Sequence, residues 1–246
     1  MRRFLVRPDA IEGRRVRFDK DETHHLRRVL RLGPGAVVEV ADGTGLVHAV
    51  RLETLDPEGA TGAIVESGTP GRESPCAITL AQAVLKGERM DWLVQKATEL
   101  GVTRIVPLLT ERVVARPTGG RPARWARIAR EAVKQCGRPV TPVVEPLRSF
   151  DALLGEVPSH DVAWLSWEGG GVPLAAAARE AGRPGRVMLV VGPEGGLSRA
   201  EVERAVAKGA RVVGLGPRIL RAESAGLVVV ALCQHLFGDL GTESSQ

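Results

Sequence analysis

From residue 77 onward, apolar runs of strand length alternate with amphipathic stretches of helical length, and this alternation constrains the fold more than any other feature. We expect strands over 77–84, 104–109, 161–166, 186–191 and 211–215, and helices over 88–100, 122–136, 173–181, 198–208 and 223–237. Strands that are apolar on both faces and alternate with helices are typical of a parallel sheet covered on both sides. The pattern therefore predicts an α/β fold over residues 75–240.

The first seventy residues have a different pattern, with short apolar segments separated by turn signals. Strands are expected over 4–7, 15–18, 36–41, 46–52 and 61–66, the third and fourth joined as a hairpin by an Asp-Gly-Thr-Gly turn. One helix is expected over 21–31, with Leu26, Val29 and Leu30 on its apolar face. Strands this short favour a small β-barrel over 1–70, and the Gly/Pro/Ser-rich stretch 67–75 is expected to be a linker.

Composition argues against several classes of protein. No apolar run reaches the roughly eighteen residues of a membrane span, and the N-terminal residues lack the apolar stretch of a signal peptide. Cys76, Cys136 and Cys233 are widely spaced and form no CxxC pair, and the five histidines are mostly scattered. We therefore expect no disulfide framework and no metal site, and we expect a cytoplasmic protein with no membrane association. A small, buried position is expected for Cys136.

Positive charge is concentrated in two blocks of a chain whose formal net charge is +5. Residues 1–31 hold ten Lys/Arg against five Asp/Glu, and residues 116–138 hold seven against one. Such blocks are typical of phosphate contacts, so we predict RNA binding by Arg2, Arg3, Arg7, Arg28, Arg31, Arg121, Arg124, Arg127, Arg130, Lys134 and Arg138. The alternative is the solvated face of an amphipathic helix over 122–136, whose Trp125, Ile128, Ala129 and Ala132 face inward. Spacings of three and four residues would place Arg121, Arg124, Arg127, Arg130 and Lys134 along one stripe of that helix, and Glu131 is the only acid in the block to oppose this basic stripe.

A glycine-rich turn follows the expected strand over 186–191 and runs into a helix. Ser198 and Glu201 have the spacing of a capping box, which fixes the start of that helix. Gly192, Gly195 and Gly196 would let the backbone approach a ligand and would expose its amides. The segment matches neither a dinucleotide fingerprint nor a Walker loop. The alternative is a tight turn that binds nothing.

A second glycine-bearing segment, 215–226, follows the next expected strand. Ligands bind outside the carboxyl ends of parallel strands, so the two segments are expected to converge on one pocket. Glu194, Arg218, Arg221 and Glu223 would surround it. The alternative is that Arg221 and Glu223 form surface ion pairs.

Six segments together resemble a known family. They are Arg2-Arg3-Phe4, the run His24 to Arg31, the stretch Lys86 to Gly101, Thr110-Glu111-Arg112, Gly192-Pro-Glu-Gly-Gly196, and Leu215 to Ser224. In this order the chain resembles the bacterial ribosomal small-subunit uridine-N3 methyltransferases of the SPOUT superfamily. One departure is Ala222-Glu223-Ser224, where the family usually has Thr-Glu-Thr.

The resemblance implies a PUA-like barrel followed by a trefoil-knotted α/β domain, acting as a homodimer with the active site at the subunit interface. It implies S-adenosyl-L-methionine as cofactor and N3 of uridine 1498 in 16S ribosomal RNA, or the small ribosomal subunit that carries it, as substrate. The cofactor-binding residues that it implies are Leu165, Ser166, Val191, Gly192, Glu194, Gly195, Gly196, Leu215, Gly216, Ile219, Leu220, Arg221 and Ser224.

The reaction that this resemblance implies needs a deprotonated uridine N3, because the protonated nitrogen has no lone pair free to accept a methyl group. A carboxylate could remove the proton, or a cationic side chain could stabilise the anion at O2 and O4. The catalytic candidates are Glu111, Arg112, Arg221 and Glu223, with Glu194 a further possible base, and the sequence leaves the base open. Two alternative functions are methylation of tRNA or of another ribosomal RNA position, and a non-enzymatic role in ribosome assembly.

Overall fold

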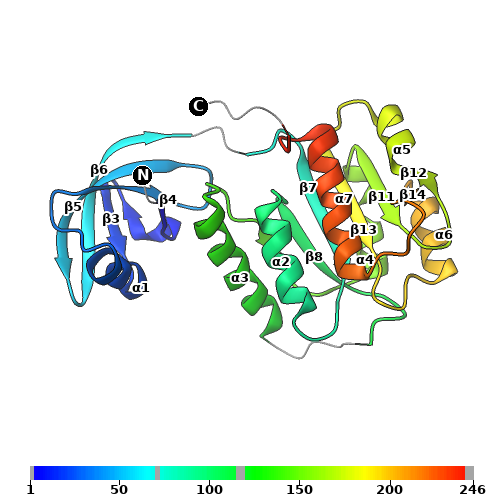
Figure 1. Ribbon diagram of the computed structural model, residues 1–246, viewed down its shortest axis with the longest axis horizontal. Coiled ribbons are helices and arrows are strands. Elements are labelled where there is room, and N and C mark those ends of the chain that lie inside the picture. The colour runs from blue at the N-terminus through cyan, green and yellow to red at the C-terminus, as the bar shows by residue number, and fades with distance from the viewer. Residues whose placement is uncertain (1–2, 70–72, 115–119, 242–246) are drawn as a thin grey trace. The chain divides into compact units, whose positions relative to one another are not determined.

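The computed structural model describes residues 3–69, 73–114 and 120–241 (Figure 1). Contacts divide the described chain into two compact units, one within Met1–Glu73 and Val133–Thr141, the other within Ser74–Ala132 and Pro142–Gln246. The short segment Val133–Thr141 thus belongs to the same unit as the N-terminal strands. In the part of the chain that the structure describes, no helix is long and apolar enough to span a membrane.

The N-terminal unit is a mostly antiparallel sheet of six strands in the order β1-β4-β5-β6-β3-β2. Its strands are β1 (Arg3–Leu5), β2 (Ile11–Glu12), β3 (Arg15–Phe18), β4 (Val37–Ala41), β5 (Val47–Asp56) and β6 (Gly59–Gly68), and a single 3-10 turn, η1, spans Pro8–Ala10. The predicted hairpin is confirmed, since β4 pairs with β5 in antiparallel register from Val37↔Arg51 to Ala41↔Val47. Phe4 and Phe18 meet edge to face in its core, with ring centroids 6.0 Å apart.

The helix of this unit changes type along its length. An α-helix, α1 (Lys20–His24), continues as a π-helix, η2 (His25–Val29), in which the Leu30 amide donates to the His25 carbonyl five residues back. A π turn holds more residues than an α turn and so rotates the side chains that follow it. The prediction that Val29 lies on the apolar face is therefore wrong: Leu26 is buried, but the Val29 side chain is 61% exposed.

The second unit is built on an eight-stranded sheet in which every pairing is parallel, and the predicted α/β class is confirmed. The strand order is β10-β8-β7-β13-β11-β14-β12, with β9 also pairing with β8. The strands are β7 (Ala77–Ala83), β8 (Arg104–Leu109), β9 (Val143–Val144), β10 (Arg148–Ser149), β11 (Val162–Ser166), β12 (Val172–Pro173), β13 (Arg186–Val191) and β14 (Arg211–Gly214).

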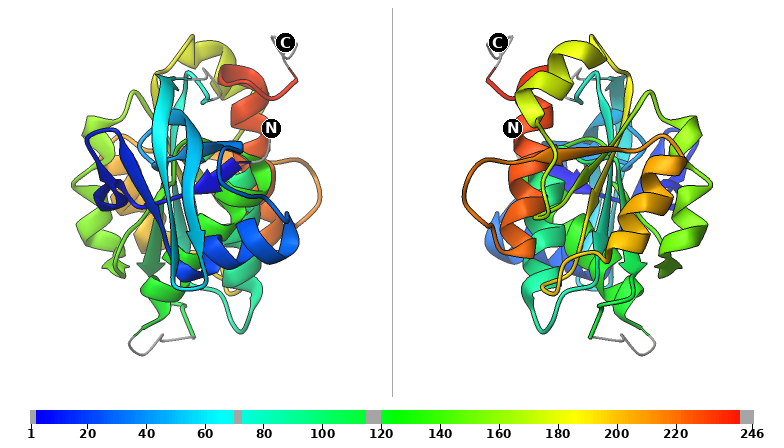
Figure 2. Two further views of the ribbon diagram at one scale, coloured as in Figure 1. Left: turned by 90° about the vertical axis from the view of Figure 1, so that its left-hand side faces the viewer. Right: turned by 90° about the vertical axis from the view of Figure 1, so that its right-hand side faces the viewer.

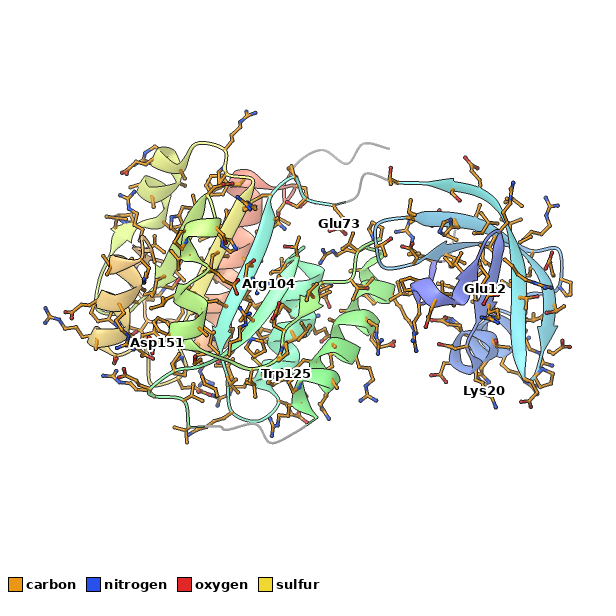
Figure 3. All side chains as sticks on the ribbon, turned by 180° about the vertical axis from the view of Figure 1, so that it is seen from behind. Glu12, Lys20, Glu73, Arg104, Trp125 and Asp151 are labelled. Atoms are coloured by element: carbon orange, nitrogen blue, oxygen red, sulfur yellow. The ribbon has the colours of Figure 1, made fainter. Side chains whose placement is uncertain are left out.

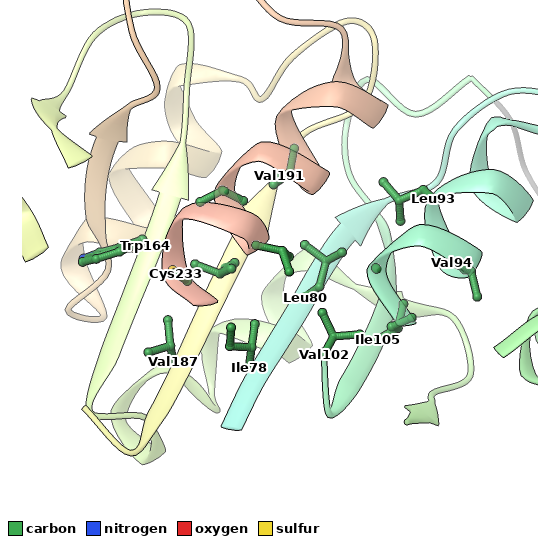
Figure 4. Packing of buried hydrophobic residues seen from close by; sticks show 14 of the residues in the cluster. Ile78, Leu80, Leu93, Val94, Val102, Ile105, Trp164, Val187, Val191 and Cys233 are labelled. Atoms are coloured by element: carbon green, nitrogen blue, oxygen red, sulfur yellow. The ribbon is translucent and has the colours of Figure 1, made fainter. Parts of the chain in front are cut away.

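Helices cover both faces of this sheet (Figure 2). They are α2 (Arg89–Glu99), α3 (Arg121–Cys136), α4 (Phe150–Leu154), α5 (Leu174–Ala181), α6 (Arg199–Ala207) and α7 (Ala222–Phe237), and a 3-10 turn, η3, spans Val157–Ser159. Alternate residues of β13 point to opposite sides. Val187, Leu189 and Val191 pack in the core that holds α2, α5 and α7, shown in part in Figure 4, while Met188 and Val190 face α4 and α6.

Two predicted helix ends are confirmed. Ser198 and Glu201 form the capping box that begins α6. Gly101 follows α2 with φ +85°, and Val102 donates to the Ala97 carbonyl, which closes the helix with a Schellman turn. A Cβ at Gly101 would overlap the buried amide of Gln234 on α7, so glycine is required there for space as well.

All three cysteines are free thiols. Cys76 and Cys233 are buried, and burial raises the pKa of Cys76 to about 11. Cys136 is exposed, so the prediction that it is buried is wrong. It is the last residue of α3, and its thiol lies 3.8 Å from the Val133 carbonyl.

His160 follows η3, and both of its ring nitrogens lie within hydrogen-bonding distance of oxygen atoms. Its Nδ1 lies 3.0 Å from the Glu156 carbonyl and its Nε2 lies 3.3 Å from the Thr79 hydroxyl, which fits a ring that donates through Nδ1 and accepts through Nε2. Burial, with the positive charges of Arg104 and Arg186, lowers the pKa of His160 below its ordinary value of 6.5. The folded state therefore favours the neutral form.

This environment predicts a loss of stability in mild acid. Because the pKa of His160 is lower in the folded protein, its contribution to the free energy of unfolding is complete above pH 6.5. That contribution is lost as the pH falls through the folded-state pKa. Urea unfolding from about pH 7.5 to pH 5 should show that His160→Gln loses less unfolding free energy on acidification than the parent protein. Parallel pH curves for the two proteins would refute the assignment.

Candidate functional site

A cavity of about 750 Å³ lies at the carboxyl ends of β11, β13 and β14. Its walls come from the loop after each of these strands, together with the start of α7 and Arg89 of α2. The glycine segments 192–196 and 214–216 both line it, so the structure brings the two segments together. This volume is in the range of pockets that enclose a small molecule or cofactor.

The glycines of the first loop lie in close contact with neighbouring groups. A Cβ at Gly192 would lie 3.1 Å from the backbone nitrogen of Leu197, and one at Gly195 would lie 3.3 Å from the Arg112 Cβ. Gly196 has φ +68°, a conformation that side chains rarely adopt, and it packs against the carboxylate of Glu168. At its three glycines the loop therefore presents only backbone to the cavity, while Glu194 contributes its side chain.

Two carboxylates in the cavity share one arginine. Nη1 of Arg89 lies 3.1 Å from Oε1 of Glu194, and its Nε lies 3.9 Å from Oε1 of Glu223. Oε1 of Glu194 also accepts from the backbone amide of Lys86 at 3.1 Å. The Glu223 side chain is 12% exposed, and its Oε2 is buried without a hydrogen-bond partner. The Ser166 hydroxyl is also buried without a partner. Both groups can accept a hydrogen bond from a ligand.

The loop after β8 braces this cavity from outside. Nη1 of Arg112 donates to the Gly195 carbonyl at 3.0 Å, and the Glu111 amide donates to Oε1 of Glu201 at 2.9 Å. Hydrogen bonds from Ser198 and then Arg204 lower the pKa of the exposed Glu111 carboxyl. Glu111 and Arg112 do not line the cavity among the described residues. Arg112 thus supports the glycine loop, and Glu111 is engaged elsewhere.

Most of the cofactor-binding residues that the resemblance implies meet at the cavity. The lining includes Ser166, Val191, Gly192, Glu194, Gly195, Gly196, Leu215, Gly216, Ile219, Leu220 and Arg221, together with Arg218 and Glu223. Leu165 and Ser224 are not in the lining: Leu165 is fully buried in the core, and Ser224 is half-buried in the first turn of α7.

Sequence reasoning missed Arg89, which lines the cavity. Arg89 lies in a stretch expected to be an ordinary helix, and only its two carboxylate partners reveal its position. Trp167 and Glu168 precede the run Gly169-Gly170-Gly171, a third glycine-rich segment after a strand. The indole of Trp167 donates to the Leu197 carbonyl at 3.3 Å and so ties this loop to the first one.

Several basic side chains of the N-terminal unit, predicted to contact RNA, instead pair with groups of that unit. Arg3 pairs with Glu39 at 3.2 Å and donates to the Gly137 carbonyl, and its side chain is 8% exposed. Arg138 is buried against Glu73 at 2.7 Å, and Lys134 pairs with Glu22 at 2.6 Å. Arg7 forms an exposed pair with Asp9. Arg2 lies outside the described residues.

Two further arginines of the N-terminal unit differ from these paired side chains. Arg28 and Arg31 are exposed, and the ion pairs among the described residues include neither. Arg31 follows the π-helix with φ +53°, and no other described residue except glycine has a positive φ. A side chain in this left-handed conformation is strained, and such strain is often found at functional positions.

The basic stripe on α3 has more acidic partners than its own sequence suggests. Arg124 pairs with Asp91 of α2 at 2.6 Å, and the indole of Trp125, labelled in Figure 3, donates to the same carboxylate at 2.9 Å. The expectation that Glu131 alone opposes the stripe is therefore incomplete, because Asp91 and Glu22 come from other helices. Arg121, Arg127 and Arg130 are exposed, with no ion pair among the described residues.

Comparison with known proteins matches both parts of the chain. Residues 72–234 match the family model described as an RNA methyltransferase domain, and residues 18–65 match the one described as an RNA methyltransferase PUA domain. Ribosomal RNA small subunit methyltransferase E of Synechocystis sp. is 36% identical over 231 residues, covering 93% of this chain and 76% of its own. Its namesake from Bacillus subtilis is 30% identical, covering 87% and 88%.

The fold matches a solved structure over nearly its whole length. The crystal structure of ribosomal RNA small subunit methyltransferase E from Neisseria gonorrhoeae bound to S-adenosyl methionine has a TM-score of 0.86 and 36% sequence identity, and the match covers 97% of this chain and 99% of that one. A PUA-like unit followed by a parallel α/β unit is therefore the architecture of both proteins. The chain belongs to the RNA methyltransferase family that includes the ribosomal RNA small subunit methyltransferases E.

Proposed function

We propose that this chain transfers a methyl group from S-adenosyl-L-methionine to N3 of a specific uridine, position 1498, in 16S ribosomal RNA of the small subunit. The observation that carries the proposal is the glycine-walled cavity at the carboxyl edge of the sheet, in a chain 36% identical to a small-subunit methyltransferase whose crystal structure is bound to S-adenosyl methionine. In this proposal, residues 1–70 are the RNA-binding domain and residues 75–240 the knotted catalytic domain.

The cavity fits this cofactor in shape and in charge. Gly192, Gly195 and Gly196 leave the backbone open to a flat adenine ring and its hydrogen-bonding edge. The cofactor also carries a positive sulfonium and a positive ammonium, and the carboxylate of Glu194, which lines the cavity, has the complementary charge. The residues proposed to hold it are those of the resemblance that line the cavity.

The chemistry divides between a base and a cation. When bound, the cofactor supplies a methyl group on a positively charged sulfur, which leaves as a neutral thioether. Glu223 takes the proton from uridine N3, because its Oε2 is free of hydrogen-bond partners, whereas the Glu111 carboxylate is paired with Arg204 and does not line the cavity among the described residues. Arg221, which lines the same cavity, stabilises the charge that develops at the uridine oxygens.

RNA binding is proposed for the exposed arginines without acidic partners among the described residues: Arg28, Arg31, Arg121, Arg127 and Arg130. Their unneutralised charge supports binding to phosphates, and a ribosomal RNA substrate supports a cytoplasmic location. A homodimer is supported by large apolar side chains left exposed on the second unit, including Trp92 at 46%, Ile219 at 87% and Leu236 at 43%.

The first prediction from the proposed function concerns the glycine loop. Gly195→Val would force a branched side chain against Arg112 and should weaken S-adenosylmethionine binding about tenfold or more, measured by titration calorimetry. The matched control is Gly33→Val, because a Cβ at Gly33 meets nothing within 4 Å. Equal affinities of Gly195→Val and the parent protein would exclude this loop as the cofactor site.

The second prediction tests the base. Glu223→Gln keeps the shape of the side chain but cannot accept a proton, so kcat for methylation of small subunits with labelled cofactor should fall about 100-fold or more. Cofactor affinity should stay within a few-fold of the parent value. If Glu223→Gln instead loses cofactor affinity and keeps kcat at saturation, Glu223 binds the cofactor and the base is another residue.

The third prediction tests the RNA surface. Arg28→Gln and Arg31→Gly should each weaken binding to 16S RNA and lower the slope of log Kd against log salt by about one for each phosphate that the variant no longer binds. Arg31→Gly should also raise the unfolding free energy by roughly 0.5–1 kcal/mol, because glycine relieves the left-handed strain at some cost in chain entropy. Arg199→Gln, whose charge is paired with Glu203, serves as the control. An unchanged salt slope in both variants would remove this surface from the proposal.

A further inference from the structure

Gln82 is a fully buried polar residue at the point where two neighbouring strands separate. It is the last residue of β7 to pair with β13, in the register Val191↔Gln82. Beyond this pair, β7 continues alongside β8 through Ala83↔Leu108, while the chain after β13 turns into the glycine loop. The backbone hydrogen bonds between β7 and β13 therefore end at Gln82.

The side-chain amide of Gln82 donates hydrogen bonds at the point where the backbone hydrogen bonds between β7 and β13 end. Its Nε2 donates to the Gly192 carbonyl at 3.2 Å and to the Ala83 carbonyl at 3.2 Å, one from each of the separating segments. Since both neighbours are carbonyl oxygens, the nitrogen must face them, and the reverse orientation of the amide would place three acceptors together. Gln82 thus fixes the direction of the Gly192 carbonyl at the first residue of the glycine loop.

The other end of the same amide meets α7. A Cβ at Gly226 would lie 2.6 Å from Oε1 of Gln82, so only glycine lets the helix backbone approach this closely. Oε1 is buried and has no hydrogen-bond partner. Gly226 lies one turn after Glu223, which lines the cavity. One buried side chain therefore contacts the glycine loop and, through Gly226, the helix that carries Glu223.

A space-filling role alone does not account for this residue. Leu93, which packs against Gly226 from the same region, is an apolar core residue, and a buried acceptor without a partner is unfavourable there. A methionine would fill similar volume without burying an amide. What the amide adds is a directional hold on the Gly192 carbonyl.

We propose that Gln82 is a positioning residue for the cofactor loop. By fixing the Gly192 carbonyl it sets the path of the chain through Gly195 and Gly196, whose backbone forms the cavity wall. This inference rests on the proposed function, because it takes S-adenosylmethionine as the ligand of that wall. Gln82 does not itself line the cavity among the described residues, so it acts on the ligand only through the loop that it holds.

The test is calorimetric titration of Gln82→Met with S-adenosylmethionine, beside steady-state kinetics on small subunits. We expect the Kd and the KM for the cofactor to rise about tenfold, with kcat at saturating cofactor within about threefold of the parent value. The control is Thr79→Val, which removes a buried hydroxyl at the other end of the same strand, 3.3 Å from Nε2 of His160. It should lower the melting temperature without changing the Kd.

The outcomes separate the two proposals. If the parent protein gives no binding heat, the proposed function fails; if it binds and Gln82→Met binds equally well, only the positioning role fails. A Kd that rises in Gln82→Met and Thr79→Val alike, in proportion to the decrease in stability, would also overturn it. Should Gln82→Met not fold, Gly226→Ala, which presses a methyl group on the Gln82 amide, must show the same rise in the Kd for the cofactor.

Discussion

The carboxylate of Glu201 is the group on which the geometry of the candidate site depends. It is 1% exposed, and it accepts hydrogen bonds from the Ser198 amide and the Glu111 amide, both at 2.9 Å. A buried charge is tolerated when backbone donors surround it in this way. Oε2 of Glu201 caps the start of α6 by accepting from the Ser198 amide, and Oε1 fixes the loop after β8 by accepting from the Glu111 amide. Arg112, next in the chain, is thereby placed to donate to the Gly195 carbonyl.

The parallel sheet explains why loops from distant parts of the chain meet at one edge. In a parallel sheet every strand delivers its following loop to the same side, so the segments after β11, β13 and β14 are neighbours whatever their separation in sequence. This much follows from the alternation of strands and helices. The sequence also predicts the start of α6, because the Ser198 and Glu201 signal is local.

What the sequence does not predict depends on long-range interactions. The exposure of Val29 follows from one π turn that its residue types do not encode, and the two-residue strands β9 and β10 are too short for a pattern. The roles of Arg124, Arg138 and Lys134 depend on acids 33 or more residues away, which no local charge count includes. In the sequence, Gln82 is one polar residue in an apolar strand. Its role is visible only from its contacts with Gly192 and Gly226, which lie more than a hundred residues away.

Gln234, the buried glutamine beside Gly101, has a consequence for α7 when it is considered together with Gln82. Near its start α7 meets the Gln82 amide through Gly226, and near its end Gln234 lies against Gly101 and accepts from the Ser74 hydroxyl at 2.7 Å. Buried polar groups can specify the register of a helix that packs mainly through apolar side chains. Two amides, each matched to a glycine at a different height along the helix, fit in one register only. The position of α7 along its own axis is therefore fixed, and the position of Glu223 relative to the sheet is fixed with it.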